Sequence, residues 1–283
     1  MGGDTFFLTS GRLRAPGFAF AQRPLKSLLG GLSLTNTVAV HLRDNGDVVL
    51  VDTGFSEAIF AEPSKTLGIA QARVLGVTRG DYSIARQLEH LGIPRSRVTT
   101  VVATHLHRDH ISGVVDFPNA ELVCSARELE SFRSRRSAAY EPRDLERSGR
   151  LRPVSLSGSP SYGFPCSLDL MKDGSVVLLD APGHTSGSVA VALRGQSGTF
   201  VHVGDAVYRS WEYARTQSAP SLLAQMTAHD RKALSRTYCF IRACEADPRR
   251  PIIVPSHDEL VFARLPQSPL LPVSEEAMAP QSA

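Results

Sequence analysis

The chain has 283 residues, 42% of them hydrophobic and 21% charged, which is close to the composition of globular proteins with a substantial core. Its net charge of +3 is too small to indicate binding to nucleic acid or to an anionic membrane. No apolar run approaches the ~18 residues that span a bilayer, and the N-terminus lacks the basic start and apolar stretch of a secretory signal. We therefore expect a cytoplasmic protein without nucleic-acid or membrane partners.

The hydrophobic pattern predicts strands in two groups, with helices between them. Residues 34–52 predict a β-hairpin, because Asn45-Gly46 separates two apolar runs. The remaining predicted elements are, in chain order, a helix at 83–91, a strand at 98–104, a helix at 125–132, strands at 176–179, 189–193 and 199–203, a helix at 228–246 and a strand at 252–254. This alternation is typical of a layered α/β fold, and we expect one domain over residues 1–283.

A cluster of histidines follows the strand predicted at 98–104. His105, His107 and His110 lie with Asp109 within six residues, and imidazole and carboxylate groups so close together are typical ligands of zinc and similar ions. Because side chains alternate along an extended segment, His105 and His107 point to one side. A turn into a helix would move Asp109 and His110 to a neighbouring position. The pattern therefore favours two metal ions.

Three more residues of the right type follow other apolar runs, namely His184, Asp205 and His257. Each comes just after a predicted strand, where a rigid sheet fixes a side chain beside an open cavity. The predicted ligand set is His105, His107 and His184 for one ion, Asp109, His110 and His257 for the other, and Asp205 as the bridge. Asp52 ends the hairpin and either accepts a hydrogen bond from a ligand imidazole or caps a turn.

These motifs resemble the metal signature of the metallo-β-lactamase-fold hydrolases. The matching segments are His-Leu-His-Arg-Asp-His at 105–110, Pro-Gly-His-Thr at 182–185, Gly-Asp at 204–205 and Ser-His at 256–257, after an Asp-Thr-Gly turn at 52–54. The resemblance implies a four-layer αββα sandwich with a dinuclear metal site along one edge. It also implies two divalent ions per chain, with Zn²⁺ expected and Fe, Co or Mn as alternatives.

Tyr208 follows the predicted bridging carboxylate by three positions. This resembles the N-acyl-homoserine lactonase group, in which a tyrosine at that place hydrogen-bonds the substrate carbonyl or the developing oxyanion. The alternative is that Tyr208 is an ordinary packing residue. The chain departs from the group at Ser188, where those lactonases often have a second histidine.

The resemblance implies a hydrolase that opens lactone or ester bonds, with N-acyl-homoserine lactones as the expected substrates. A hydroxide between the ions would attack the carbonyl, Tyr208 would stabilise the oxyanion, and Asp109 could pass a proton to the leaving alkoxide. Residues 1–33 are expected to form a loop that covers the substrate. Phe18, Phe20 and Phe55 are candidate contacts for the acyl chain, with core packing as the alternative.

Other functions within the same superfamily stay open at this point. Thioester hydrolases resembling glyoxalase II and phosphodiester hydrolases use similar metal sites, but they lack the tyrosine after the bridging aspartate. A diiron redox protein usually carries a glutamate in the first motif, where this chain has His107. A catalytically silent scaffold would be expected to have lost ligands. The sequence leaves the natural substrate and the oligomeric state open.

Overall fold

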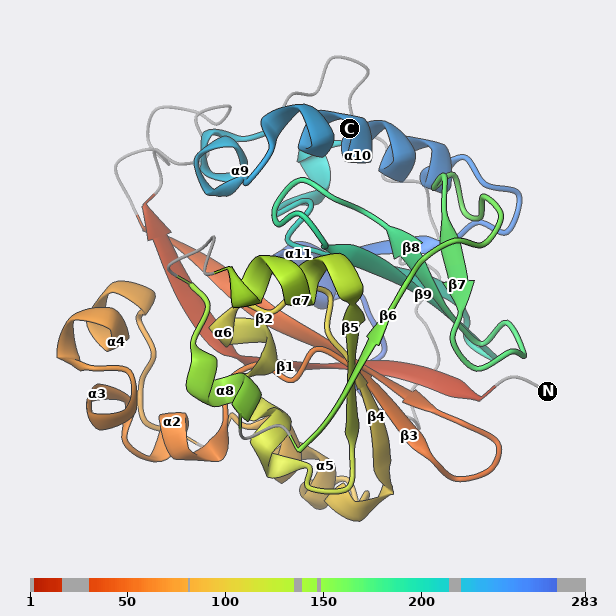
Figure 1. The fold of residues 1–283 in the computed structure, drawn as a ribbon. Helices are drawn as coiled ribbons and strands as arrows, with labels where there is room; N and C mark the ends of the chain where they lie inside the picture. The colour runs from red at the N-terminus through yellow and green to blue at the C-terminus, as the bar shows by residue number, and fades with distance from the viewer. Residues whose placement is uncertain are drawn as a thin grey trace.

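A computed structural model describes residues 3–16, 31–80, 82–134, 139–146, 149–213 and 220–268 of the chain. Phe18 and Phe20, two of the candidate acyl contacts, lie outside these residues. The described part forms two β-sheets packed face to face between outer helices (Figure 1). This arrangement confirms the predicted four-layer αββα sandwich.

The first sheet has six strands in the order β1-β2-β3-β4-β5-β6, and the second has five in the order β11-β10-β9-β8-β7. The strand bounds are Asp4–Pro16 (β1), Gly31–Leu42 (β2), Val48–Val51 (β3), Val98–Val102 (β4), Glu121–Ser125 (β5), Arg150–Val154 (β6), Ser167–Asp169 (β7), Val176–Asp180 (β8), Val189–Gly195 (β9), Gly198–Gly204 (β10) and Ile252–Pro255 (β11). Parallel pairing joins β3 to β4 and β10 to β11. The carboxyl ends of each pair therefore meet at one edge of their sheet.

Helices cover the outer face of each sheet. Their bounds are Glu57–Ala61 (α2), Pro63–Thr66 (α3), Ile69–Leu75 (α4), Ile84–His90 (α5), Arg108–Ile111 (α6), Ala126–Arg133 (α7), Pro142–Glu146 (α8), Leu222–Thr227 (α9), Arg231–Glu245 (α10) and Glu259–Phe262 (α11). Short 3₁₀ turns lie at Arg95–Arg97, Ser112–Asp116 and Ser210–Glu212. Helices α5 and α7 pack on the first sheet, and α10 packs on the second (Figure 1).

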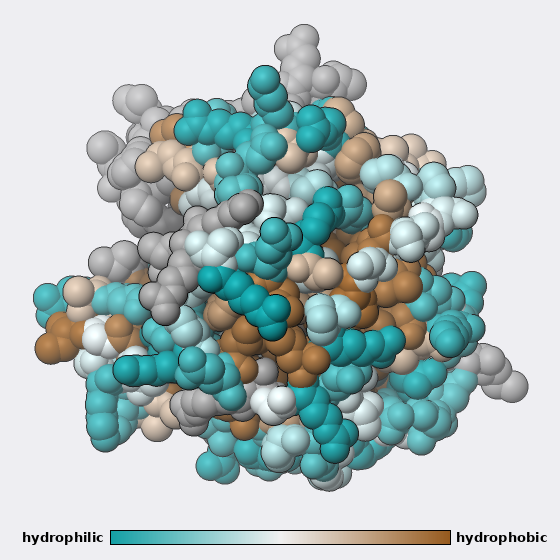
Figure 2. All heavy atoms as spheres, in the orientation of Figure 1, coloured by the Kyte–Doolittle hydropathy of each residue, from teal (hydrophilic) through white to brown (hydrophobic). Residues whose placement is uncertain are grey.

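The alternation of side chains along β3 shows how the layers separate. Val48 and Leu50 pack against the outer helices of the first sheet, whereas Val49 and Val51 face the second sheet. Because both faces of the strand are buried, it carries four consecutive apolar residues. On the face shown in Figure 2, hydrophilic side chains dominate and hydrophobic ones show through in the middle.

Most of the predicted elements are present, but two predictions need correction. The expectation of an N-terminal loop over residues 1–33 is wrong for Asp4–Pro16, which form β1 and pair antiparallel with β2. The pairing buries Phe6 on one face and Phe7 on the other. The helix predicted at 228–246 begins only at Arg231, because Asp230 caps it by accepting from the N–H groups of Lys232 and Ala233.

The hairpin predicted at 34–52 is confirmed by the antiparallel pairing of β2 with β3. Helix α5 begins after Ser83, whose side chain accepts from the N–H of Arg86. Among the described residues, no helix has both the length and the apolar character needed to cross a membrane.

Gly54 occupies a position that the fold reserves for glycine. Its φ is +64°, and a Cβ there would lie 2.0 Å from the Cβ of Ser10. We expect Gly54→Ala to lower the free energy of unfolding through backbone strain of about 1–2 kcal/mol plus an overpacking cost of about 1–3 kcal/mol. Equilibrium denaturant unfolding measures this change.

The matched control is Gly92→Ala, because Gly92 has a φ of +75° but a Cβ added there would meet no atom within 4 Å. This variant should show the strain alone. Equal losses of stability in the two variants would contradict the clash inferred at Gly54.

Candidate metal centre

All seven predicted ligands lie at the carboxyl ends of strands, on one edge of the sandwich. His105 and His107 follow β4, and the short helix α6 then carries Asp109 and His110. His184 follows β8, Asp205 follows β10 directly, and His257 comes two residues after the end of β11. The six-stranded sheet therefore supplies the first four residues, and the five-stranded sheet supplies the other three.

The side chains converge into three overlapping groups whose nitrogen and oxygen atoms lie within 4.8 Å of one another. These groups are His105, His107 and His184; His105, His110 and Asp205; and Asp109, His110 and His257. Asp205 lies between the histidines, since its Oδ1 is 3.1 Å from Nε2 of His257 and 3.3 Å from Nε2 of His110, and its Oδ2 is 3.6 Å from Nε2 of His184. The predicted ligands therefore come together in one cluster whose groups offer metal-binding atoms.

A buried network behind the ligands fixes which imidazole nitrogen faces the centre. His110 donates from Nδ1 to Oδ2 of Asp52 over 2.8 Å, so the hydrogen bond expected for Asp52 is present. Nδ1 of His105 lies 3.1 Å from Oγ1 of Thr104, and this hydroxyl donates to the same Asp52 oxygen over 2.9 Å. His257 donates from Nδ1 to the carbonyl oxygen of Thr35 over 2.6 Å. Such partners set the tautomer and leave Nε2 free for a metal.

Burial and charge divide the histidines into two sets. Burial lowers the pKa of His105 well below its usual value, that of His107 to about 4 and that of His184 to about 3. These imidazoles are neutral, which is the form that binds metal. At His110 and His257 burial is the largest influence and acts to lower the pKa, but the carboxyl groups around them, Asp205 foremost and Asp109 with it, together outweigh burial and raise both pKa values. A cation bound there would replace protons.

A second, independent observation also supports metal binding by these residues. Nε2 of His105, Nε2 of His110 and Oδ1 of Asp205 are buried and have no hydrogen-bond partner among the described residues. Unpaired polar atoms in the interior are costly and rare. Three of them directed into one cluster of imidazoles and carboxylates are explained if divalent ions are their partners. The residues present therefore fit metal binding.

Tyr208 lies against this cluster. Its ring stacks on His257 with centroids 5.5 Å apart and an interplanar angle of 14°, and its centroid is 6.3 Å from that of His184. The hydroxyl lies 3.2 Å from Oγ1 of Thr227. The side chain is thus buried beside two candidate ligands, within a turn that begins at Asp205.

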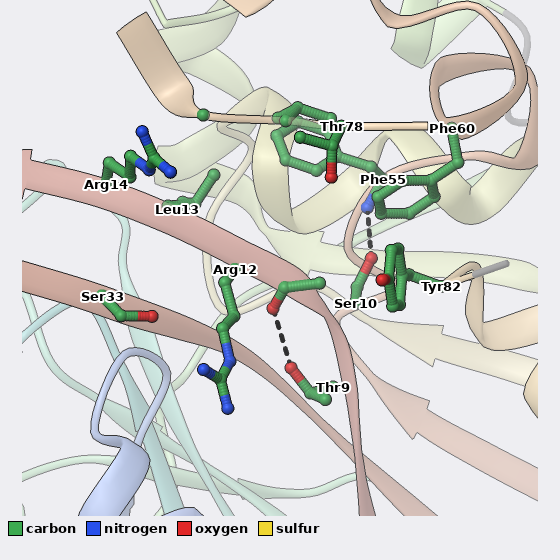
Figure 3. A pocket seen from close by; sticks show the side chains of 13 residues that line it. Thr9, Ser10, Arg12, Leu13, Arg14, Ser33, Phe55, Phe60, Thr78 and Tyr82 are labelled. Atoms are coloured by element: carbon green, nitrogen blue, oxygen red, sulfur yellow. Dashed lines mark hydrogen bonds between the residues drawn. The ribbon is translucent and has the colours of Figure 1, made fainter. Parts of the chain in front are cut away.

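Phe55 lies in the wall of a cavity of about 880 Å³ (Figure 3). Its ring packs edge-on against Phe60, with centroids 6.1 Å apart, and its backbone N–H donates to Oγ of Ser10 over 2.9 Å. Phe55 is almost fully buried, so it belongs to the core and also faces the cavity. Both roles considered for this residue from the sequence are therefore compatible with its position.

Glu128, on α7, was not among the predicted site residues. Its carboxylate is fully buried. Oε1 accepts from the N–H of Leu106 over 2.9 Å, and Oε2 accepts from the hydroxyl of Thr185 over 2.5 Å. Leu106 lies between His105 and His107, and Thr185 follows His184. Glu128 therefore joins the two loops that carry the first group of histidines.

A sequence signal for Glu128 existed, but it indicates a different role. Ser125 and Glu128 have the spacing of a capping box at the start of a helix. Ser125 does cap α7 by accepting from the N–H of Glu128 over 3.0 Å. The glutamate side chain, however, turns to the metal loops and also accepts from the hydroxyl of Tyr140 over 2.9 Å. Its tertiary partners cannot be read from the local pattern.

The fold and the site together define a metallohydrolase-type centre at the edge of an αββα sandwich. The family model of the metallo-beta-lactamase superfamily matches residues 30–236. The chain therefore belongs to the metallo-β-lactamase superfamily, as the motifs predicted.

Several curated relatives show the range of activities near this chain. A probable metallo-hydrolase of Mycobacterium tuberculosis is 34% identical over 183 residues, which are 63% of this chain and 58% of that protein. N-acyl homoserine lactonase AiiB of Agrobacterium fabrum is 26% identical over 95% of this chain and 98% of that protein. A hydroxyacylglutathione hydrolase of Shewanella baltica is 27% identical over 59% of this chain and 58% of that protein. The chain thus spans less than two thirds of the first and third of these relatives.

A solved structure has the same fold over nearly its whole length. It is an N-acyl homoserine lactone hydrolase with the product N-hexanoyl-L-homoserine bound at its catalytic metal center. The TM-score is 0.71 at 18% identity, and the match covers 92% of this chain and 95% of that one.

Glu128→Gln tests whether this carboxylate orders the histidine loops. The amide keeps the size of the side chain but cannot accept the Thr185 hydroxyl at its NH₂ group. We expect the affinity for Zn²⁺ to fall about 10- to 100-fold, as is common when partners behind metal ligands are changed. Competition with a chromogenic chelator measures the affinity, and calorimetry measures the melting temperature.

Glu130→Gln on the same helix is the control, because the side chain of Glu130 is exposed. Zinc affinity that is unchanged in Glu128→Gln would show that Glu128 has only a packing role.

Proposed function

We propose that this protein is a hydrolase with two divalent metal ions that opens lactone or ester bonds, with N-acyl-homoserine lactones as the leading substrate class. The observation that carries the proposal is the position of Tyr208. Its ring stacks on the candidate ligand His257, and the residue comes three positions after Asp205, the candidate bridging aspartate. The relationship to a lactonase over 95% of the chain supports the same assignment.

In this proposal His105, His107 and His184 would hold one ion, Asp109, His110 and His257 would hold the other, and Asp205 would serve as a shared ligand. Zinc suits a set of imidazole and carboxylate ligands, although Fe, Co or Mn can occupy similar sets. Bound ions would polarise the substrate carbonyl and lower the pKa of water so that water attacks near neutral pH. The buried network through Asp52 keeps the imidazoles in place for this task.

Tyr208 is proposed to donate a hydrogen bond to the carbonyl oxygen as negative charge develops there. Its stacking on His257 fixes the ring, while its hydroxyl lies beside the hydroxyl of Thr227. A rotation of the tyrosine O–H towards a bound carbonyl needs no movement of the backbone.

Asp109 is proposed to return a proton to the leaving alkoxide. Its side chain is 22% exposed, against 5% for Asp205, so it is the more accessible carboxylate of the cluster. Its backbone carbonyl accepts from Nδ2 of Asn36 over 2.6 Å, which holds the residue at the mouth of the site. Oδ2 lies 3.5 Å from Nε2 of His110.

Thioester hydrolysis is the second candidate function, because a hydroxyacylglutathione hydrolase is among the relatives. The same metal ligands serve both reactions. Purified, zinc-loaded protein should be assayed on an N-acyl-homoserine lactone series, a glutathione thioester and bis(p-nitrophenyl) phosphate. A kcat/KM that is highest for the thioester or the phosphodiester would replace the lactonase proposal.

Tyr208→Phe tests the proposed role of the Tyr208 hydroxyl. The change keeps the ring stacked on His257 and removes only the hydroxyl, so lactone turnover should fall about 10- to 1000-fold with metal content and melting temperature nearly unchanged. Steady-state kinetics on the best lactone of the series measures the effect. Tyr213→Phe is the control, because Tyr213 is a buried tyrosine of the same hydrophobic cluster. Wild-type turnover in Tyr208→Phe would leave Tyr208 as a packing residue.

His257→Ala tests the proposed stoichiometry. Because His257 belongs to only one of the three ligand groups, its loss should reduce metal content from about two ions per chain to about one. Elemental analysis after dialysis measures the content. His90→Ala is the control, since this histidine is exposed on α5. An unchanged content in His257→Ala would refute the assignment of this residue.

A further inference from the structure

We propose that the cavity beside the metal centre binds an acyl chain whose far end carries a carboxylate. The inference rests on the proposed function, because it treats this cavity as the acyl part of the substrate site. It goes further by naming the chemical class of the chain. Two features carry it: an apolar, aromatic wall and two arginines that have no carboxylate partner among the described residues.

The wall of the cavity suits an aliphatic chain. Phe55 and Phe60 pack edge-on with centroids 6.1 Å apart, and Tyr82 packs on Phe60 at 5.7 Å. Leu13 and Val77 add buried aliphatic surface. The volume of about 880 Å³ is within the usual range for ligand pockets. Such a surface favours methylene groups over water.

Two arginines of β1, Arg12 and Arg14, also line the cavity (Figure 3). Both are exposed, and neither has an ion pair with a described residue, although Arg43 and Arg95 elsewhere on the surface do. The hollow continues past Arg14 towards Arg73. The described residues that line the cavity and this continuation include no aspartate or glutamate.

The undescribed residues that adjoin the cavity lining in the sequence are residues 17–30, after β1, and Asp81, before Tyr82. Residues 17–30 contain no aspartate or glutamate, but they do contain Arg23 and Lys26. The cavity thus combines an apolar wall with guanidinium groups that no described carboxylate neutralises. It therefore matches a ligand that is apolar along its length and anionic at its end. Guanidinium groups bind carboxylates through paired, charge-assisted hydrogen bonds.

The cavity is adjacent to the metal centre through two strands. On β1, Ser10 lies in the cavity wall and contacts Gly54, whose N–H donates to the carbonyl oxygen of His110 over 3.2 Å. On β2, Ser33 lines the cavity, and two residues later the carbonyl of Thr35 accepts from His257. These contacts place the cavity wall next to the segments that carry His110 and His257, and the proposal puts the acyl chain in the cavity with its carbonyl at the candidate ligands.

The first experiment measures binding without catalysis. The probes are the N-methylamide of decanoic acid, which ends in a methyl group, and the mono-N-methylamide of sebacic acid, which ends in a carboxylate. Both have the same chain length. The wild-type protein should bind the carboxylate-ended probe about tenfold more tightly, the gain expected of a charge-assisted pair. Isothermal titration calorimetry measures both affinities, and added salt should reduce the preference because it screens the charges.

The matched variants isolate the two guanidinium groups. Arg12→Gln/Arg14→Gln should abolish the preference and leave binding of the methyl-ended probe unchanged, and Arg12→Lys/Arg14→Lys should retain part of it. Arg150→Gln is the control, because Arg150 is exposed on β6 at the opposite edge of the same sheet. Tighter binding of the methyl-ended probe by the wild type, or a preference that survives in the double glutamine variant, would overturn the inference.

The second experiment separates this inference from the proposed function. Homoserine lactones with the same two acyl chains are compared as substrates. The double glutamine variant should raise KM for the carboxylate-ended lactone with kcat unchanged, since the chain end is remote from the reacting carbonyl. A binding preference without hydrolysis of either lactone would remove the lactonase proposal and keep the inference. Hydrolysis of both lactones without any preference would keep the lactonase proposal and overturn the inference about the carboxylate.

Discussion

The carboxylate of Asp52 is the interaction on which the metal centre depends. It is fully buried at the end of β3, with a φ of 62°, in a left-handed conformation that aspartate tolerates better than most residues. Three hydrogen bonds hold it there: Oδ1 accepts from the N–H of Thr104, and Oδ2 accepts from the Thr104 hydroxyl and from His110. One side chain thus ties the end of β3 to the end of β4 and orients two candidate ligands. A buried anion of this kind is stable only when its partners are complete.

Glu128 is a second buried carboxyl group that holds the candidate ligands in place. Glu128 accepts from a backbone N–H between His105 and His107 and from the hydroxyl beside His184. Asp52 and Glu128 are therefore two buried carboxyl groups that hold different parts of the ligand-bearing loops. Together with the carboxyl groups of Asp109 and Asp205, they supply oxygen atoms near the candidate histidine ligands, a composition that suits divalent cations. If divalent cations bind there, their removal would leave this group of buried polar side chains without partners, and metal binding would then be coupled to folding.

The sequence predicted the layered fold and all the candidate ligands, because strands and metal motifs leave local signals. Runs such as Val48–Val51 are visible as buried strands, and imidazole and carboxylate groups at strand ends have few other uses. β1 was missed because it ends in Pro16 and is followed by Gly17, two residues that suggest a loop. Arg150–Val154 was missed because its exposed arginines and its proline hide an edge strand. Glu128 was missed because its partners are distant in sequence, and no local pattern encodes them.

Each sheet supplies different residues of the site, so the site forms only when the two sheets pack together. The six-stranded sheet supplies the histidine motif, the Asp52 network and the arginine-lined cavity, whereas the five-stranded sheet supplies His184, Asp205, Tyr208 and His257. Asp205 contacts histidines from both sheets, so its position depends on their packing. In the proposed mode, a substrate with its chain in the cavity and its carbonyl near Tyr208 would contact residues of both sheets. The energy that holds the two sheets together, mostly their shared apolar core, therefore also sets the geometry of the chemistry.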